Sequence, residues 1–203
     1  GLWCPLLHFV ILPLRSPKVA LKYASVWLPG GSPLAVHTAA LADAVGQRLP
    51  GWRVAHAMRY GNPSMGKVLQ ALRDEGVRRV RVLPLYPQYS TTTTASVADV
   101  IARQGDGMHI EMLQDYHRDG DWASAVARSI RAHWDAQGRG ERVLLSFHGI
   151  PQRLVDAGDP YAAQCEASTV AIAEALGISR SEILVTFQSR FGKERWLQPY
   201  TQQ

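Results

Sequence analysis

Cysteine is scarce in this chain of 203 residues, which contains only Cys4 and Cys165. The two lie far apart and form no Cys-X-X-Cys pair, so neither a disulfide framework nor a metal site built from cysteines is indicated. Low-complexity tracts are missing as well. These absences fit a globular protein that folds in a reducing cytoplasm.

Long hydrophobic runs are also lacking. The most apolar stretch, residues 1–14, is too short to cross a bilayer, which takes about 20 apolar residues. It has no initiator methionine, no basic leading segment and no small-residue cleavage site, unlike a secretory signal. It could be buried in a core, line a site for a large apolar ligand, or touch a membrane. We expect the chain to be a fragment whose first residue is not the natural N-terminus.

The formal net charge of +5 favours anionic partners. The basic residues are scattered among acidic ones, and there is no RNA-recognition or zinc-finger pattern, so nucleic acid is not an expected partner. With 46% hydrophobic residues the chain can bury a core. Its length suits one large domain or two small ones, since domains commonly hold roughly 100–150 residues.

Helical and strand patterns alternate along the chain, which predicts parallel sheets with helical crossovers. Ser32-Pro33 predicts the start of a helix with Leu34, His37, Leu41 and Val45 at helical spacing. A second helix is predicted between Asn62-Pro63 and Gly76, and further helices at 95–103, 122–134 and 160–176. Strands are predicted at 52–60, 80–86, 108–113, 143–147 and 183–187. A break near 138–140 separates two halves of similar layout.

Two of the predicted strands end in unusual turns. Residues 143–147 lead directly into His148, and the strand that starts at residue 80 leads into a long hydroxyl-rich turn that reaches Thr94. Ligands of open α/β sheets bind in the crevice beyond the carboxyl ends of the strands. The two turns therefore predict one shared cleft.

Five segments of the sequence carry a more specific signal. They are Met58-Arg59-Tyr60-Gly61-Asn62-Pro63, Leu83-Pro84-Leu85-Tyr86-Pro87-Gln88-Tyr89-Ser90 with Thr92-Thr93, Ser146-Phe147-His148-Gly149-Ile150-Pro151, Gly158-Asp159-Pro160-Tyr161, and Phe187-Gln188-Ser189-Arg190-Phe191-Gly192 with Trp196-Leu197. In type and order these segments resemble the ferrochelatase family, whose members insert ferrous iron into a porphyrin. The resemblance covers almost the whole chain.

The resemblance implies an α/β fold of two Rossmann-like, chelatase-type halves with parallel sheets and flanking helices, which face each other across a porphyrin cleft. Residues 1–138 would form the N-terminal half, without its first strand and with the segment at the porphyrin mouth. Residues 139–203 would begin the second half, without its C-terminal part. The family's catalytic glutamate is expected beyond Gln203, so we expect the 203-residue chain to be inactive by itself.

The implied activity is that of a lyase of haem biosynthesis that inserts ferrous iron into protoporphyrin IX. Its partners would be protoporphyrin IX and Fe²⁺, with no required cofactor. The expected location is cytoplasmic, with peripheral membrane contact through the apolar N-terminal segment as an option. An iron–sulfur cluster, the oligomeric state and a preference for protoporphyrin or coproporphyrin stay open.

His148 is the residue expected to carry the chemistry. A free-base porphyrin loses two pyrrole protons as the metal enters, so a neutral imidazole near the ring centre can accept a proton or hold the metal briefly. The resemblance implies these catalytic and metal-binding roles for His148. The alternative is a histidine that caps the strand end through a backbone hydrogen bond. The other six histidines show no metal-ligand spacing.

The resemblance also implies porphyrin-binding roles for three groups of side chains. Arg15, Lys18 and Tyr23 would surround the porphyrin mouth, where the two cations complement the propionates; a solvated basic face is the alternative. Tyr60 would face the metal side of the pocket or pack in the core. The remaining residues would line the pocket walls: Tyr86, Gln88, Tyr89, Ser90, Thr93, Gln188, Ser189 and Trp196. Helix capping by the threonines and core burial of Trp196 are the competing readings.

Two other functions stay open. One is a related chelatase that inserts cobalt or nickel into another tetrapyrrole, although the segments 86–94 and 187–192 favour the iron enzyme. The other is a tetrapyrrole-binding or transport module without catalysis. An acidic helix beyond Gln203 in the natural gene would distinguish the enzyme from the module.

Overall fold

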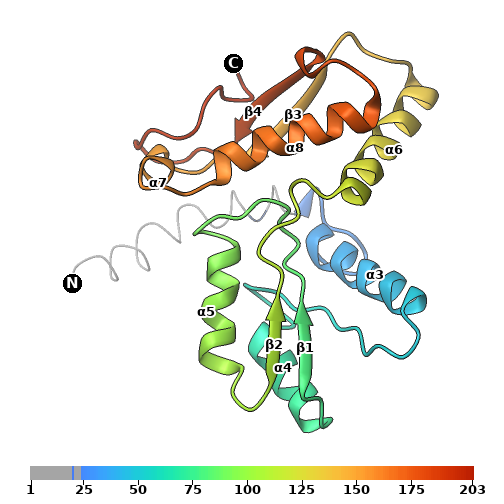
Figure 1. Cartoon of the computed structure of the whole chain (residues 1–203), viewed down its shortest axis with the longest axis vertical. Helices are drawn as coiled ribbons and strands as arrows, with labels where there is room; N and C mark the ends of the chain where they lie inside the picture. The colour runs from blue at the N-terminus through green and yellow to red at the C-terminus, as the bar shows by residue number, and fades with distance from the viewer. Residues whose placement is uncertain (1–19, 21–23) are drawn as a thin grey trace. The chain divides into compact units, whose positions relative to one another are not determined.

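The computed structural model describes Ala20 and residues 24–203 and divides into two compact units, Gly1–Leu72 and Arg73–Gln203. Figure 1 shows the elements. In chain order they are α3 (Pro33–Arg48), α4 (Met65–Asp74), β1 (Arg79–Val82), α5 (Thr94–Gln104), β2 (His109–Met112), α6 (Gly120–Gln137), β3 (Val143–His148), α7 (Gln152–Asp156), α8 (Tyr161–Leu176), the 3₁₀-helix η2 (Arg180–Glu182) and β4 (Ile183–Gln188).

Helix α3 of the first unit starts at the position that the sequence predicts. Ser32 caps α3 by accepting a hydrogen bond from Ala35 N at 3.2 Å, and Pro33 fits the first turn because it has no N–H to leave unpaired. The helix is confirmed, but its predicted apolar stripe is not buried: Leu34 and Leu41 are exposed. None of the described helices is long and apolar enough to cross a membrane.

The prediction of a strand at residues 52–60 is wrong. Residues 52–57 join no ladder, and only Met58 forms a single bridge, with Ser64. An apolar stretch becomes a strand only when a neighbouring chain pairs with its backbone, and among the described residues this segment has no such neighbour. The next helix, α4, is confirmed, and Gly76 follows it with φ of 82°.

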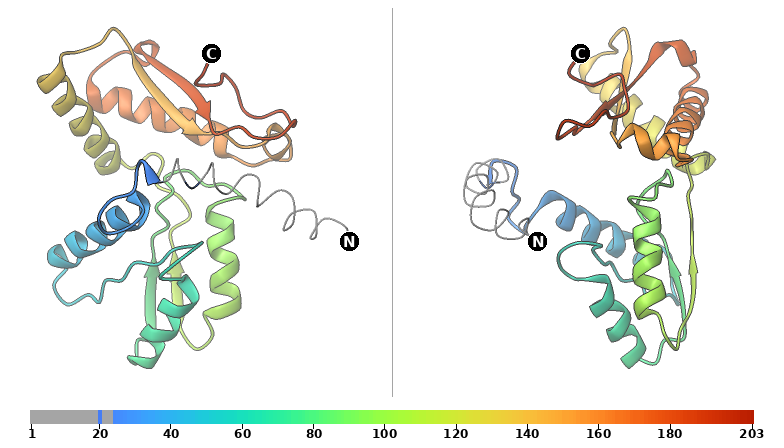
Figure 2. Two further views of the ribbon diagram at one scale, coloured as in Figure 1. Left: turned by 180° about the vertical axis from the view of Figure 1, so that it is seen from behind. Right: turned by 90° about the vertical axis from the view of Figure 1, so that its left-hand side faces the viewer.

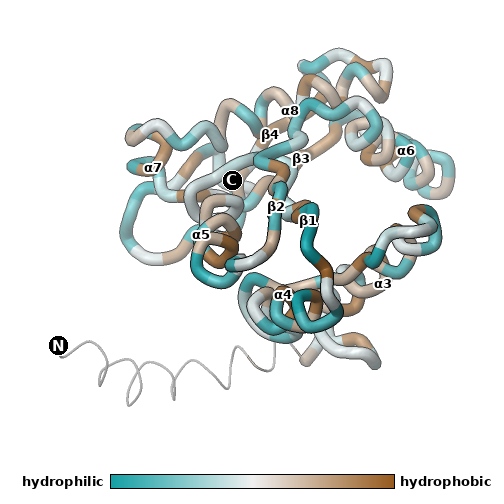
Figure 3. The backbone as a smooth tube through the Cα atoms, turned by 60° about the horizontal axis from the view of Figure 1, so that its bottom comes forward, coloured by the Kyte–Doolittle hydropathy of each residue, from teal (hydrophilic) through white to brown (hydrophobic). Residues whose placement is uncertain are grey.

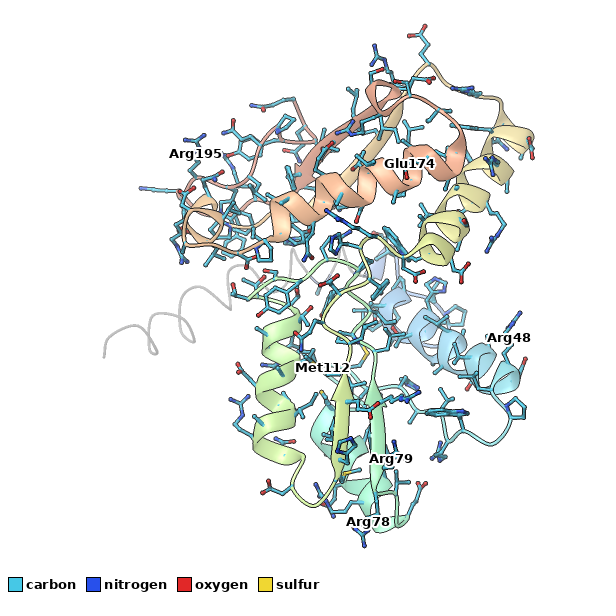
Figure 4. The ribbon with its side chains drawn as sticks, in the orientation of Figure 1. Arg48, Arg78, Arg79, Met112, Glu174 and Arg195 are labelled. Atoms are coloured by element: carbon cyan, nitrogen blue, oxygen red, sulfur yellow. The ribbon has the colours of Figure 1, made fainter. Side chains whose placement is uncertain are left out.

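The second unit contains two small parallel sheets, which confirms the predicted α/β class with parallel strands and flanking helices. β1 pairs with β2 in the register Arg79↔His109 to Val82↔Met112, and α5 is the crossover between them (Figure 2). Arg79 and Met112 are labelled on the two strands in Figure 4. β1 ends at Val82 instead of continuing to the predicted residue 86, since Pro84 and Pro87 have no N–H for a ladder.

The β3–β4 sheet is the larger of the two. Six residue pairs run from Val143↔Ile183 to His148↔Gln188, and α8 returns the chain from one strand to the other. Polar and apolar positions alternate along α6 in Figure 3, and the apolar side meets α8. The resulting core contains Ala123, Ala127, Ile172, Ala173, Leu176 and Ile183.

Alternation along β3 gives its two faces different environments. Val143, Leu145 and Phe147 are half-buried, whereas the alternate residues Leu144, Ser146 and His148 are exposed. A second core of Ile150, Tyr161, Cys165, Phe187 and Leu197 lies near the carboxyl end of this sheet. The predicted boundary between two Rossmann-like halves near residue 138 stays a prediction.

Candidate functional site

His148 is the last residue of β3, where the sequence places it, and its side chain is exposed. Its Nδ1 lies 2.7 Å from the carbonyl oxygen of Gly149. A carbonyl oxygen can only accept, so this contact assigns the hydrogen to Nδ1. In the neutral ring Nε2 then carries the lone pair and is the atom that can take up a proton or bind a metal. The capping contact considered from the sequence is thus present and compatible with chemistry at Nε2.

Trp196 lies beside His148 and is buried, as the core alternative predicted. The two ring centroids are 6.4 Å apart, and the Phe191 ring packs edge-on against Trp196 at 5.0 Å. The indole Nε1 has no hydrogen-bond partner among the described residues. Antiparallel pairing of Pro151 with Trp196 and a bond from Gln152 N to the Arg195 carbonyl hold the segment in place (Figure 4 labels Arg195).

Gly149 makes this close packing possible. A Cβ on Gly149 would stand 3.1 Å from the Gln188 carbonyl oxygen and 3.3 Å from Cε3 of Trp196. The Gly149 N–H donates to that same carbonyl at 2.8 Å. Glycine therefore lets the turn after His148 lie flat against the end of β4.

Gln188 and Ser189, predicted for the opposite pocket wall, are both exposed at the end of β4. Their strand pairs with β3, which brings Gln188 level with His148 in the register. Ser189 has φ of 70°, the left-handed region that residues with a side chain rarely adopt. Such backbone strain is often found at functional sites.

The hydroxyl-rich turn after β1 is partly buried and is hydrogen-bonded to α8. Gln88 and Ser90 are buried, whereas Tyr86 is exposed and Tyr89 is half-buried. Gln88 Nε2 donates to Ser168 Oγ at 2.8 Å, and Tyr89 N donates to Gln164 Oε1 at 2.6 Å. Both acceptors belong to α8. The buried members of the predicted pocket wall thus attach the turn to the helix.

Asp159 binds the next two residues of the turn, Ser90 and Thr91. Its Oδ2 accepts from Ser90 Oγ at 3.0 Å, from Thr91 N at 2.8 Å and from Thr91 Oγ1 at 2.7 Å. The threonine side chains were expected to cap α5; Thr93 is its N-cap residue, but its Oγ1 has no partner among the described residues. Burial favours the neutral form of the Asp159 carboxyl, but the bonds from Thr91, Tyr161 N and Ser90 outweigh it and hold the pKa below its usual value.

Tyr161 connects α8 to the histidine. Its phenol donates to the main-chain carbonyl of His148 at 2.9 Å. Burial raises the pKa of this phenol, so it keeps its proton and remains a donor. Sequence reasoning did not assign Asp159, Tyr161, Gln164 or Ser168 to the site. The segment Gly158-Asp159-Pro160-Tyr161 was the available signal, but it was used only for the resemblance and as a helix start.

Four predicted site residues are not tested by the structure. Tyr60 belongs to the first unit, where its ring is 72% exposed and the Arg59 guanidinium lies 4.5 Å from its centroid. Arg15, Lys18 and Tyr23 lie outside the described residues. Their binding roles stay predictions.

No preformed metal cluster supports the metal role of His148: nowhere in the described part of the chain do three or more His, Cys, Asp or Glu side chains gather as a metal site. Two other histidines contact carboxylates. His117 Nδ1 lies 2.6 Å from Asp115, and His109 Nε2 lies 3.3 Å from Glu111. Among the histidines that the structure describes, His148 thus combines the carboxyl end of a strand with a hydrogen bond that occupies only Nδ1.

Comparison with known proteins gives a consistent result. The Ferrochelatase family model matches residues 1–203. Ferrochelatase of Stenotrophomonas maltophilia (strain R551-3) is 57% identical over 204 residues, which cover 99% of this chain and 64% of that protein. Ferrochelatases of Xylella fastidiosa (strain 9a5c) and Vibrio atlanticus (strain LGP32) are 55% and 48% identical, each over 98% of this chain and 63% of the relative. The chain thus spans about 63% of the length of such relatives.

Proposed function

Because the chain belongs to the ferrochelatase family, we propose that the full-length protein inserts ferrous iron into protoporphyrin IX, a lyase reaction of haem biosynthesis. The observation that carries the proposal is the state of His148. Its Nδ1 is occupied by the Gly149 carbonyl, which leaves Nε2 as a base at the carboxyl end of β3.

The reaction needs such a base. Two pyrrole protons leave the macrocycle as the metal enters, and an imidazole whose ordinary pKa is near 6.5 can accept a proton at neutral pH and release it again. A carboxylate that lies outside this sequence would share the work in the full-length protein. Distortion of the flat ring, supported by binding at its periphery, would turn the nitrogen lone pairs toward the metal.

The porphyrin-binding part of the proposal rests on exposed residues near the strand ends. Tyr86, Gln188 and Ser189 are accessible at the ends of their segments, and the Trp196 ring is buried next to His148. Tyr60, Tyr23, Arg15 and Lys18 are proposed to act at the periphery of the porphyrin. Gln88 and Ser90 act indirectly, since both are buried and bonded to other side chains.

No cofactor is part of the proposal; Fe²⁺ is a substrate. An iron–sulfur cluster needs thiolate ligands, and burial raises the pKa of Cys165 to about 12. Cys165 therefore stays a thiol and is a poor cluster ligand. We place the protein in the cytoplasm, with peripheral membrane contact through residues 1–14 as the part of the proposal that rests on sequence alone.

The propionate contacts can be tested separately. Arg15→Ala and Lys18→Ala should weaken binding of dicarboxylate porphyrins more than binding of their methyl esters, because an ester carries no charge. The difference should shrink as salt is added. Fluorescence titration of both porphyrin types measures it; equal weakening for acid and ester would indicate lost packing instead.

The activity itself is tested with the purified full-length protein, protoporphyrin IX and Fe²⁺ under anaerobic conditions. Haem absorbance should increase with enzyme concentration, and Co²⁺ and Ni²⁺ serve as comparison metals. Porphyrin binding without formation of any metalloporphyrin would instead identify a non-catalytic tetrapyrrole-binding protein.

A further inference from the structure

One face of α8 holds both the turn after β1 and the strand end that carries His148. Along the helix, Tyr161, Gln164 and Ser168 are spaced by three and four residues, so their side chains point to the same side. Gln164 and Ser168 bond the turn at Tyr89 and Gln88, and Asp159 bonds it at Ser90 and Thr91 just before the helix begins. Each residue of the turn from Gln88 to Thr91 is therefore hydrogen-bonded to α8 or to Asp159.

Tyr161 extends this set of contacts to the histidine. Its backbone N–H donates to Asp159 Oδ1 at 3.0 Å, while its phenol donates to the His148 carbonyl at 2.9 Å. Thr91 and His148, 57 positions apart in the sequence, are thus connected by three consecutive hydrogen bonds that pass through Asp159 and Tyr161. Figure 1 shows the start of α8 beside the ends of β3 and β4.

Burial makes these contacts hard to exchange for water. Asp159 is 6% exposed, Tyr161 8% and Ser90 0%. When a partner is removed, the remaining buried donor or acceptor loses its hydrogen bond without gaining one from solvent. Hydrogen bonds to the ionised Asp159 carboxylate are also stronger than neutral ones. The start of α8 cannot shift without breaking several bonds together.

We propose that Asp159 and Tyr161 are positioning residues that fix the His148 imidazole relative to the turn of residues 88–94. This inference rests on the proposed iron insertion, in which the basic Nε2 must meet the porphyrin centre at bonding distance. Tyr161 holds the backbone of His148, and Asp159 holds Tyr161 and the turn at the same time. Neither residue touches substrate.

The test uses the full-length protein and variants that remove single polar atoms. Tyr161→Phe removes one hydroxyl and keeps the buried ring; Asp159→Asn keeps the size of the side chain and removes its charge. We expect kcat for metalloporphyrin formation to fall roughly tenfold to a hundredfold in both, with KM for the porphyrin nearly unchanged. Should Asp159→Asn fail to fold, Tyr161→Phe decides.

Thr169→Val is the matched control. The Thr169 hydroxyl is also buried in α8 and donates to the Cys165 carbonyl; within the described part of the chain it makes no hydrogen bond to the turn or to His148. It should lower the melting temperature about as much as Tyr161→Phe while kcat stays close to that of the wild type. This comparison separates positioning from a general loss of stability.

A spectroscopic readout does not depend on activity. The ¹⁵N spectrum of the imidazoles, with the His148 signals identified by their absence in His148→Ala, should show a changed His148 environment in Tyr161→Phe but not in Thr169→Val. A kcat loss no larger than that of the control, or an unchanged His148 signal, overturns the inference. A wild-type protein without iron insertion would refute the proposed function instead, and the His148 spectrum would then decide the structural link alone.

Discussion

At the scale of single residues, hydrogen bonds determine which chemical form each group presents. The Gly149 carbonyl fixes the tautomer of His148, and three donors on Oδ2 keep Asp159 ionised although it is buried. The same logic distinguishes Cys165, which burial keeps protonated. The partner of His148 is its neighbour in the sequence, whereas the donors to Asp159 Oδ2 come from residues almost 70 positions away.

The lowered pKa of Asp159 predicts how its contribution to stability depends on pH. A carboxyl whose folded-state pKa is below its unfolded value, about 3.9, stabilises the fold above the unfolded value and loses that contribution as pH falls through the folded pKa. Asp159→Asn should therefore destabilise the protein at pH 7, and the charge-dependent part of the difference should vanish at acid pH. Urea unfolding of both proteins between pH 7 and pH 3 measures this; a gap that widens toward acid would contradict the assignment.

Ser189 predicts an effect of backbone strain. A left-handed conformation costs a residue with a side chain roughly 1–2 kcal/mol, and glycine adopts it freely. Ser189→Gly should leave the free energy of unfolding unchanged or raise it by up to about 1 kcal/mol, since glycine also gains entropy in the unfolded chain. Ser189→Val at the same position should lower it, because a β-branched residue tolerates this φ least. Equal effects of the two substitutions would show that the strain is absent in solution.

At the scale of elements, the ends of β3 and β4 depend on the close approach of two turns. Gly149 lies between the Gln188 carbonyl and the Trp196 ring, and the Trp196 segment pairs with residues 150 and 151. The sheet end, the histidine and the tryptophan therefore form one packed group. A substitution at Gly149 should therefore disturb the sheet end, His148 and Trp196 together.

Gly149→Ala tests this packing. The added methyl group would stand within 3.3 Å of two neighbours, and crowding of this kind costs about 1–3 kcal/mol. We expect lower stability together with a shift in the fluorescence of Trp196, measured against a Trp196→Phe background to identify its signal. Gly140→Ala is the control, because its methyl group would meet only the Arg142 carbonyl at 3.8 Å. Equal stability of the two variants would argue against the close packing.

At the scale of the whole molecule, the alternation of helical and strand patterns in the sequence predicted the fold class and the order of most helices and strands. The helix starting at Pro33 and the strands at 143–147 and 183–187 were predicted because local caps and apolar runs determine them. The strand at 52–60 failed because pairing partners are not encoded locally. Of the site, His148 could be predicted from its strand end.

The tertiary contacts of the site could not be predicted in the same way. Gln88 and Ser90 were predicted to line a pocket wall, which stays a prediction; their side chains bond Ser168 of α8 and Asp159 just before it, 80 and 69 residues further along the chain. Asp159 and Tyr161 look like a helix start in the sequence, and only the folded arrangement shows that they hold the turn and the histidine. Side-chain partners at such separations follow from packing, which periodicity does not encode.

The central claim is that Nε2 of His148 is the base or metal ligand of a ferrochelatase, and one measurement tests it most directly. The rate of iron insertion into protoporphyrin IX is compared between the full-length wild type and His148→Ala, with porphyrin affinity measured on the same samples by fluorescence titration. We expect the variant to lose most of its insertion rate, roughly a hundredfold or more for a lost general base, while porphyrin affinity remains close to that of the wild type. Near-normal insertion by His148→Ala would contradict the claim.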